Sequence, residues 1–489
     1  MDSRIEAWNA RKQRVIPQER SMLLQIALLI FTTAALLIPS VYVRAIMIIV
    51  LGALTYLRER ALGLMVPVSP GFAFWIGDSL SYVVGGIGTA VLFNVWDDFG
   101  NRYLGNALLY LGLGHASYIM GTWLCGNRVH PDMRKRRVTG ELTFNSFSIC
   151  IIFALFVVPV IGMYYLKTAG FGKIYYNLVI GPLQSIQELP IILLAIYLIQ
   201  SKPKLWVVFL LFGATFAVPF EGIIVGYGRM KLPFAVITLV LIWVSLKKKY
   251  EMKISSKEKW LLLITPIILV LLFAVNTKYR ELVNLNPWLS TEERFQKIRD
   301  SSIDTFSIHY ADDIVTGMVG NLVDRLVEKE SIELLNLSET GAIERVGWSL
   351  RDLKEILLSW VPQTFYPEKG KGYGRDIMEY YGLCAPSNNI PVTVLSDIFR
   401  RSGVLGVVLL YGFMGVLSTL IALKLTRHWG TLGMVLGFYF MVRHIALNSG
   451  DALGVLNLYI YRLPGSGLVI FALLFFTGIL KLNREPCRK

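Results

Sequence analysis

Charged residues are scarce in this sequence. Only 17% of its 489 residues are Asp, Glu, Lys or Arg, whereas soluble domains carry roughly 25%. Hydrophobic residues make up 54% of the chain. A helix needs roughly 20 apolar residues to cross the bilayer core, and runs of that length recur along most of the sequence. The composition therefore excludes an ordinary soluble enzyme and predicts an all-α, polytopic membrane protein.

The sequence also lacks the usual signatures of metal and cofactor chemistry. Its four cysteines form no CxxC pair and have no metal-ligand spacing with His. It contains no nucleotide-binding Gly loop, no HExxH motif and no nucleophile elbow. No acidic cluster has the spacing of a divalent-cation site. We therefore expect neither a metal nor a cofactor, and an activity that survives a chelator.

A cleavable leader is not apparent, and the positive charge does not indicate nucleic acid. The first twenty residues are polar and the first apolar run leads directly into a second, which is typical of a membrane anchor. The formal net charge is +15. Its Lys and Arg residues lie mostly in short loops between apolar runs, where the positive-inside rule places them. A nucleic-acid-binding domain would gather them on one folded face.

Hydropathy predicts about twelve membrane spans and three regions. Residues 1–276 hold nine spans, 277–402 form one large polar loop, and 403–489 hold three spans and a short tail. The predicted spans are 21–39, 41–57, 72–96, 106–125, 146–165, 178–199, 205–225, 232–246, 261–276, 403–423, 430–448 and 459–480.

The positions of the basic residues predict the orientation. They precede the first span and follow the fourth, sixth, eighth and twelfth spans, which places all these segments on one side if the spans alternate. We expect both termini to be cytoplasmic and the loop 277–402 to be extracytoplasmic. Amphipathic patterns around Leu334 and over 350–360 predict short helices within this loop.

Several polar side chains stand out at or inside the predicted spans. Arg229 follows Gly226 and Gly228 at an outer turn, where it could either snorkel to headgroups or grip a phosphate through its planar fork. Arg443 and His444 lie inside the eleventh span, which favours a functional site over a buried ion pair. Four other intramembrane groups could equally hold helices together. They are Asp78, His115, Glu188 and Glu221.

The large loop holds two further cationic candidates. Arg325 lies in a helical pattern. Lys369 follows Pro362 and Pro367, which flank aromatic residues, and a Gly-rich stretch comes after it. A segment that is first rigid and then flexible suits the lip of a site for an elongated ligand. A proline-stiffened loop lying on the membrane would have the same sequence.

Three blocks of residues resemble the Wzy-type oligosaccharide repeat-unit polymerases. The first is Gly228-Arg229 at the start of a span. The second runs from Asp324-Arg325-Leu326 to the Pro362…Pro367-Glu368-Lys369 element. The third is Leu395-Ser396-Asp397-Ile398-Phe399, followed by Gly403 and a span. The family more often has Glu at the position of Asp397, and its paired Arg-ten-residues-Gly motifs are not apparent here.

The resemblance implies a metal-independent glycosyltransferase of the inner membrane. Such an enzyme joins polyprenyl-diphosphate-linked oligosaccharide repeat units at the outer face, among membrane lipids and with a chain-length regulator as a conceivable protein partner. It implies that Arg229, Arg325, Arg443 and Lys369 bind the diphosphate. Asp397 and His444 are then the candidate bases for the acceptor hydroxyl. Two alternatives stay open, an O-antigen ligase-like transferase and a polysaccharide or lipid transporter.

Overall fold

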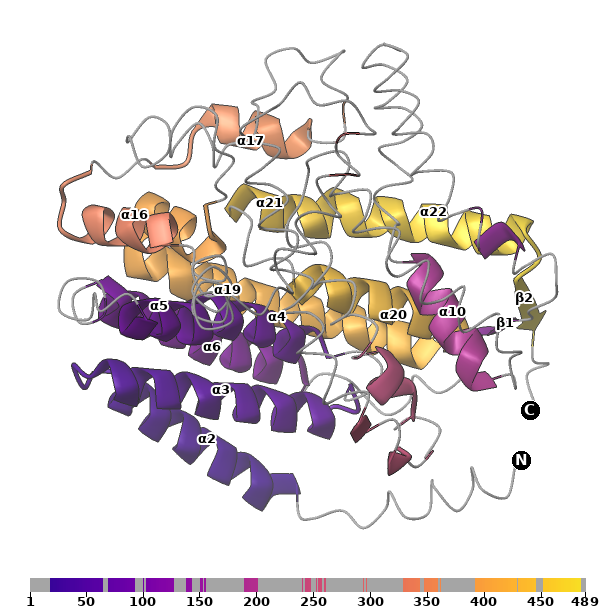
Figure 1. The fold of residues 1–489 in the computed structure, drawn as a ribbon, viewed down its shortest axis with the longest axis horizontal. Coiled ribbons are helices and arrows are strands. Elements are labelled where there is room, and N and C mark those ends of the chain that lie inside the picture. Colours follow the sequence, from indigo (N-terminus) through magenta and orange to yellow (C-terminus); the bar gives the residue numbers. More distant parts are fainter. Residues whose placement is uncertain are drawn as a thin grey trace.

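The computed structural model describes chiefly residues 18–64, 69–92, 103–126, 138–142, 189–200, 242–247, 329–343, 347–358, 392–428, 430–445 and 452–484, with a few isolated residues between them. Most of this part of the chain is helical, as the sequence predicts. Figure 1 shows the long helices lying side by side as a bundle.

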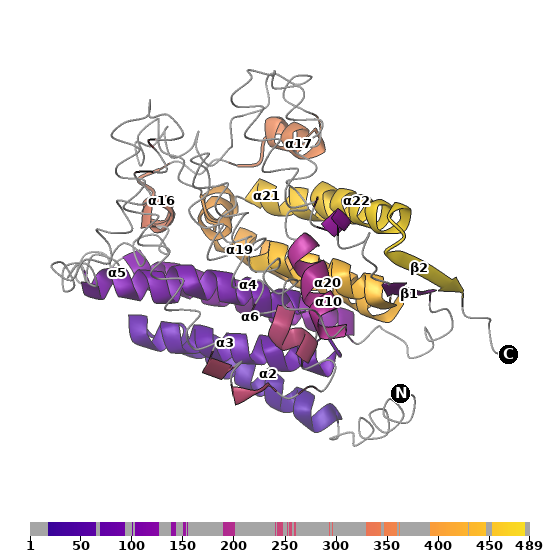
Figure 2. The ribbon, with the colours of Figure 1, turned by 45° about the vertical axis from the view of Figure 1, so that its right-hand side comes forward.

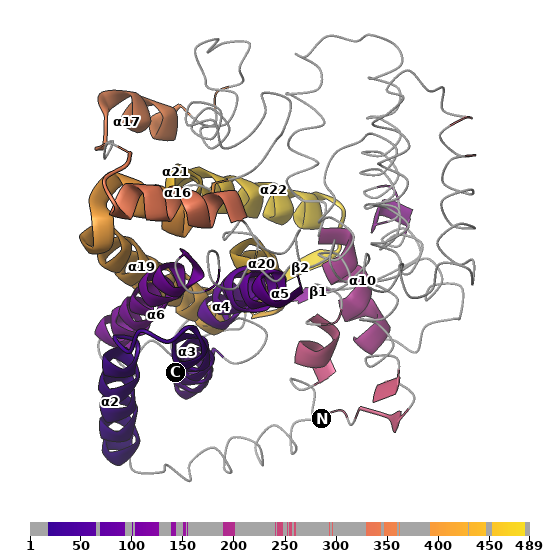
Figure 3. The same cartoon turned by 60° about the vertical axis from the view of Figure 1, so that its left-hand side comes forward.

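The first four predicted spans are helices in the structure. They are α2 (Gln18–Ala35), α3 (Val41–Ala61), the continuous segment α4 (Pro70–Asp78), η1 (Ser79–Gly85) and α5 (Gly86–Leu92), and α6 (Gly105–Gly126). The middle turns of the third segment, η1, have π-helical hydrogen bonding. One more helix, α10 (Leu189–Gln200), overlaps the sixth predicted span. In Figure 3, α2 and α10 lie on opposite flanks of the bundle.

The last three predicted spans are also helical. They correspond to α19 (Val394–His428), α20 (Gly430–Ile445), and the continuous segment α21 (Ala452–Asn457), η7 (Leu458–Arg462) and α22 (Leu463–Phe476). The helix α19 begins before the predicted span, and its backbone breaks at Gly403, where φ is 63° and ψ is −156°. Two short helices precede it, α16 (Lys329–Glu339) and α17 (Leu350–Leu357). The helix predicted over 350–360 is thus confirmed as α17.

The described helices have the polarity of a membrane protein. Three segments are long and apolar enough to cross a bilayer, namely Val41–Ala61, Val394–Leu425 and Ala452–Phe476. Many large apolar side chains on these helices point outward, including Ile46, Leu405 and Leu409. A soluble protein rarely exposes so much contiguous apolar surface, whereas lipid covers it in a membrane.

The helices α6 and α19 approach each other closely through small residues. A Cβ atom on Gly121 would collide with the carbonyl oxygen of Gly412, and one on Gly415 would collide with the backbone of Tyr118. The Ser117 hydroxyl donates a hydrogen bond to the carbonyl of Val408 (2.6 Å). Small residues and hydroxyl hydrogen bonds are the usual means of packing helices in lipid. This contact joins the amino-terminal and carboxy-terminal parts of the chain.

Two short strands add a small antiparallel ribbon to the helices. Strand β1 (Val138–Leu142) pairs with β2 (Leu480–Arg484), and Gly140 lies opposite Leu482. An all-α fold class does not include this ribbon, which forms because the segments after α6 and α22 meet at one end of the bundle. We call this the ribbon end. In Figures 1 and 2 the ribbon lies at the side of the bundle away from α16.

The short helix α16 docks at the other end of the bundle, where α6, α19 and α21 begin. The carboxylate of Glu339 accepts hydrogen bonds from Asn106 Nδ2 (2.7 Å) and the Tyr110 hydroxyl. The side-chain amide of Asn336 donates to the carbonyl of Tyr103 (3.1 Å). We call this the loop end, because α16 and α17 belong to the predicted loop 277–402.

Candidate functional site

Asp397 lies at the centre of a buried charge cluster at the loop end. It occupies the first turn of α19, and none of its surface is exposed. Its Oδ1 accepts hydrogen bonds from Arg400 Nη2 (3.0 Å) and Arg401 Nε (3.0 Å). Its Oδ2 accepts hydrogen bonds from Arg401 Nε (3.1 Å) and the backbone N–H of Ala452 (3.1 Å). The carboxylate therefore joins two guanidinium groups to the first residue of α21.

These contacts leave Asp397 little capacity to act as a base. A carboxylate offers about four lone-pair positions, and three N–H groups make four contacts with this one, because the Arg401 Nε–H is shared between both oxygens. Arg400 and Arg401 follow it by three and four residues, so the helix itself places the charges on one face. The arrangement suits a residue that fixes the position of the two arginines.

The second carboxylate of the cluster comes from the large loop. Arg401 Nη1 donates to Asp352 Oδ2 at 2.9 Å, and neither side chain is exposed by more than 1%. Asp352 also caps α17, because its carboxylate accepts from the Ser349 backbone N–H (2.8 Å) while the Ser349 hydroxyl accepts from the Asp352 backbone N–H (3.2 Å). Burial raises the pKa of Asp352, but the hydrogen bonds from Ser349 and Arg401 outweigh it, and the pKa lies below its ordinary value.

Trp348 closes the side of the cluster next to α19. Its indole N–H donates to the Ser402 hydroxyl (3.0 Å), and its ring lies 5.0 Å from the guanidinium carbon of Arg401. A guanidinium over an aromatic face is stabilised electrostatically. About half of the Trp348 side chain is exposed. The indole therefore separates the charge pair from the surface at this point.

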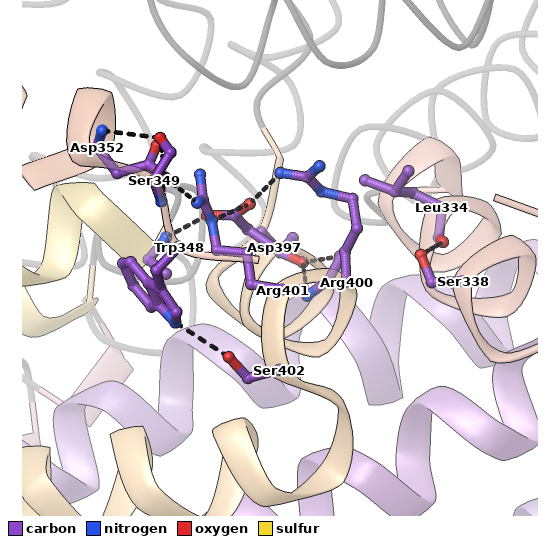
Figure 4. Close-up of polar contacts among 12 residues, drawn as sticks. Leu334, Ser338, Trp348, Ser349, Asp352, Asp397, Arg400, Arg401 and Ser402 are labelled. Carbon is purple, nitrogen blue, oxygen red and sulfur yellow. Dashed lines mark hydrogen bonds and ion pairs between the residues drawn. The ribbon is translucent and has the colours of Figure 1, made fainter. Parts of the chain in front are cut away.

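Arg400 and Arg401 approach Asp397 from different sides. In Figure 4, Arg401 lies on the side of Ser349 and Asp352 and Arg400 on the side of Leu334 and Ser338, and both guanidinium groups reach the Asp397 carboxylate. Arg400 is only 2% exposed, and its Nε has no hydrogen-bond partner among the described residues. A buried guanidinium with unused donor capacity is the arrangement that an anionic ligand can complete.

His444 is held by two hydrogen bonds inside the bundle. Its Nδ1 lies 2.8 Å from the carbonyl oxygen of Phe440, which can only accept, so Nδ1 carries the proton. Its Nε2 then accepts from the Tyr459 hydroxyl at 2.6 Å. Both ring nitrogens of the neutral imidazole are thus engaged. The arrangement holds α20 against η7 and leaves neither ring nitrogen free to act as a base on a substrate.

Arg443 is the more accessible of the two neighbouring residues. Its guanidinium lies 5.1 Å from the Tyr439 ring centroid, and its Nε donates to the Tyr439 hydroxyl (3.2 Å). Arg443 and His444 occupy the last turn of α20, and Ala452 opens the next helix. Within the described residues, no hydrogen bond or ion pair joins either of them to Asp397.

Three of the predicted substrate-binding residues lie outside the described residues. They are Arg229, Arg325 and Lys369. Of the four intramembrane groups left unranked, Glu188 and Glu221 are also outside them. Asp78 and His115 are described, and the structure pairs them, with His115 Nε2 lying 3.0 Å from Asp78 Oδ2.

Sequence reasoning missed most of the cluster around Asp397. The opposite charges of Asp397, Arg400 and Arg401 at helical spacing are a local signal that could have indicated a buried network. Asp352 and Trp348 carry no such signal, because they reach the cluster from a segment far away in the sequence. Among the described residues, no three His, Cys, Asp or Glu side chains gather as a metal site.

Comparison of the chain with protein-family models, curated proteins and solved structures gave no match.

Proposed function

We propose that this protein is a polymerase that joins polyprenyl-diphosphate-linked oligosaccharide repeat units into a surface polysaccharide. One observation carries the proposal: the loop helix α17 is fastened to the start of α19 by the buried Arg401–Asp352 pair. Loop and spans thus form one polar site at the end of the bundle. A lipid-linked donor needs such a place, because its diphosphate lies at the membrane surface while its tail stays in lipid.

The proposal includes a topology. The chain has about twelve spans in the inner membrane of a bacterium, with both termini cytoplasmic and the loop 277–402 outside. Two packing features agree with it. The ribbon joins two segments that this topology places in the cytoplasm. The helices α16 and α17 dock where α6, α19 and α21 begin, which are all outer ends in this topology.

The chemistry consists of one exchange of bonds at a sugar carbon. The bond from the growing chain to the polyprenyl diphosphate breaks, a hydroxyl of the next unit forms the glycosidic bond, and the hydroxyl proton passes to solvent water. Negative charge develops on the departing diphosphate. Preorganised cationic groups stabilise it. We assign this role to Arg229, Arg325 and Arg443, with Lys369 as a fourth group.

The surroundings of Asp397 and His444 change the role we give them. Both were candidate bases, and protein donors now bind both carboxylate oxygens of Asp397 and the accepting nitrogen of His444. We propose that Asp397 is a positioning residue for Arg400 and Arg401. His444 orders the outer end of α20, and thereby Arg443, through Tyr459.

Reconstitution of the purified protein in vesicles with one polyprenyl-diphosphate oligosaccharide tests the function. A polymerase gives a ladder of lengthened lipid-linked chains. A ligase-like transferase gives no ladder and instead moves one chain onto a separate lipid acceptor. A transporter moves the intact donor across the vesicle membrane with no new glycosidic bond. Either of the last two results would overturn the proposal.

A further inference from the structure

A carboxylate and an imidazole meet in the interior of the bundle, away from the cluster at Asp397. Asp78 ends α4 and His115 lies in α6, and their side chains are 2% and 1% exposed. The rings of Phe74 and Tyr411 border the imidazole, with centroid distances of 5.6 Å and 5.8 Å. Ionisable groups inside a membrane protein are costly and usually functional.

Within the part of the chain that the structure describes, several buried polar atoms around the pair have no hydrogen-bond partner. They are Nδ1 of His115, the Tyr411 hydroxyl and the Ser79 hydroxyl. Buried groups of this kind are normally satisfied by protein or by bound water, so each such atom requires an explanation. The π-helical turns of η1 begin directly after Asp78, and such turns often occur at functional sites. The pair thus has unused capacity to donate and accept.

Three buried hydroxyl groups form a hydrogen-bonded series between η1, the segment that begins after Asp78, and the loop end. Tyr82 follows Asp78 by four residues, and its hydroxyl is 2.6 Å from the Thr393 hydroxyl. Thr393 in turn is hydrogen-bonded to the hydroxyl of Ser396, which directly precedes Asp397. All three side chains are at most 1% exposed. Each hydroxyl can donate and accept at once, so the series can pass a proton along without a net change.

Among the described residues, the other titratable groups near the pair are few. Tyr411 faces it from α19, and Tyr82 faces Tyr411 from η1. Glu59 of α3 lies at the start of α4, where Ser69 and the backbone N–H groups of Gly71 and Phe72 bind its carboxylate. His444 of α20 is engaged by Phe440 and Tyr459. Within the described residues, no Lys or Arg is paired with Asp78.

We propose that the Asp78–His115 pair is a proton-binding site inside the membrane. The hydroxyl groups of Tyr82, Thr393 and Ser396 connect it to the loop end. The ligand is a proton, which the pair takes up and releases as it exchanges with the surface. A pair that only clasps α4 to α6 would keep one protonation state. The inference does not depend on the polysaccharide chemistry, because it concerns the titration of two side chains.

Infrared difference spectra test the site in the full-length protein in phospholipid nanodiscs. The difference between the spectra taken at low and at neutral pH should contain a carbonyl band from protonated Asp78. Asp78→Asn should abolish that band. Glu59→Gln is the matched control, because it removes another buried carboxyl and should leave the Asp78 band in place. A spectrum that Asp78→Asn does not alter would overturn the proposal.

Two further measurements cover the pathway and the risk of misfolding. Tyr82→Phe should slow hydrogen–deuterium exchange at the pair, whereas Tyr118→Phe, which removes a buried hydroxyl bound to Ser418, should not. Equal rates in the two variants would rule out the hydroxyl series.

If Asp78→Asn does not fold, nuclear magnetic resonance of histidine-labelled parent protein follows His115 directly. Its signal is assigned by substituting the other histidines. A His115 signal that does not change with pH would exclude the proton site.

Discussion

At the scale of single residues, Asp397 connects three segments that are distant in the sequence. Through Arg401 it reaches Asp352 of α17, and through the backbone N–H of Ala452 it reaches α21. Buried charges of this kind do not add stability by themselves, since their desolvation is costly. Their removal one at a time is costly as well, because the remaining charges lose their partners.

Asp397→Asn should therefore destabilise the protein strongly. The amide keeps the size of the side chain but leaves Arg400 and Arg401 with one compensating carboxylate between them. Loss of one partner from a buried charge network costs about 3–5 kcal/mol. Thermal unfolding in detergent, followed by tryptophan fluorescence, measures the change. Asp352→Asn is the control and should cost less, because Arg401 keeps its bonds to Asp397. Equal stability of Asp397→Asn and the parent would contradict the proposed positioning role.

Arg229→Lys tests the proposed diphosphate binding. Lys keeps the charge but not the two-pronged guanidinium, so the variant should insert normally yet lose most polymer formation. Arg229→Ala should lose slightly more, and Lys231→Ala in the same turn should change little. The measurement is the polymer ladder in a deletion strain complemented with each variant, with membrane protein level as the control. Normal ladders from Arg229→Lys would favour snorkelling to headgroups, which Lys does equally well.

The residues of the cluster show what a sequence can predict at this scale. Asp397 is found through a family resemblance, and its role changes only when its four donor contacts are known. The Asp78–His115 pair could not be predicted, because the two residues lie on different helices whose rotation about their axes is not fixed by hydropathy. Arg229, Arg325 and Lys369 remain predictions.

At the scale of elements, α17 follows from its sequence and its position does not. The capping box of Ser349 and Asp352 and the apolar spacing of Leu350, Leu353 and Leu357 predict a short amphipathic helix. Those three leucines are exposed, while Asp352 and Ile356 are buried. The helix thus docks through its polar cap as well as through an apolar side chain, which periodicity alone would not indicate.

The docking of α17 should depend on pH. The pKa of Asp352 lies below its ordinary value in the folded protein, so the ionised carboxylate stabilises the docked helix. That stabilisation is complete above the ordinary carboxyl pKa of about 3.9 and is lost as pH falls through the lower folded value. Amide exchange of residues 347–358, compared at each pH with Asp352→Asn, should show protection at neutral pH that disappears in acid. If the ratio of the exchange rates in the parent and in Asp352→Asn stays constant with pH, the carboxylate does not hold α17.

The break in α19 at Gly403 should be essential to the same docking. Its φ of 63° and ψ of −156° belong to a region that side-chain-bearing residues avoid, at a cost of about 1–3 kcal/mol. Gly403→Ala should therefore lower thermal stability and shift residues 394–402 away from Trp348 and Asp352. Gly467→Ala is the control, because it lies in α22 with open space around it and should be neutral or stabilise by up to about 1 kcal/mol. Equal behaviour of both variants would mean that the break is not required.

At the scale of the whole molecule, hydropathy predicts the described helices well because it is a local property. The helices α3, α6 and α20 begin at or within one residue of the predicted spans. The ribbon could not be predicted in the same way. Each of its strands is only five residues long, and strand pairing depends on the segment opposite, which here follows the last helix. The ribbon thus fixes the segment after α6 beside the segment after α22.

A cysteine pair across the ribbon tests this relation and the proposed topology together. Thr139 and Asn483 are register partners, and Cα atoms of antiparallel partners lie about 4.5–5.5 Å apart, which suits a disulfide. In a background with the native cysteines replaced, Thr139→Cys/Asn483→Cys should cross-link in opened membranes, whereas Thr139→Cys/Leu480→Cys, three positions out of register, should not. In intact cells a membrane-impermeant thiol reagent should reach neither position, because the proposed topology places both in the cytoplasm, while it should label Cys384 in the otherwise native chain. Cross-linking together with labelling from outside would support the ribbon but show that the orientation is opposite to the proposed one. Failure to cross-link in opened membranes would show that the two strands are not paired.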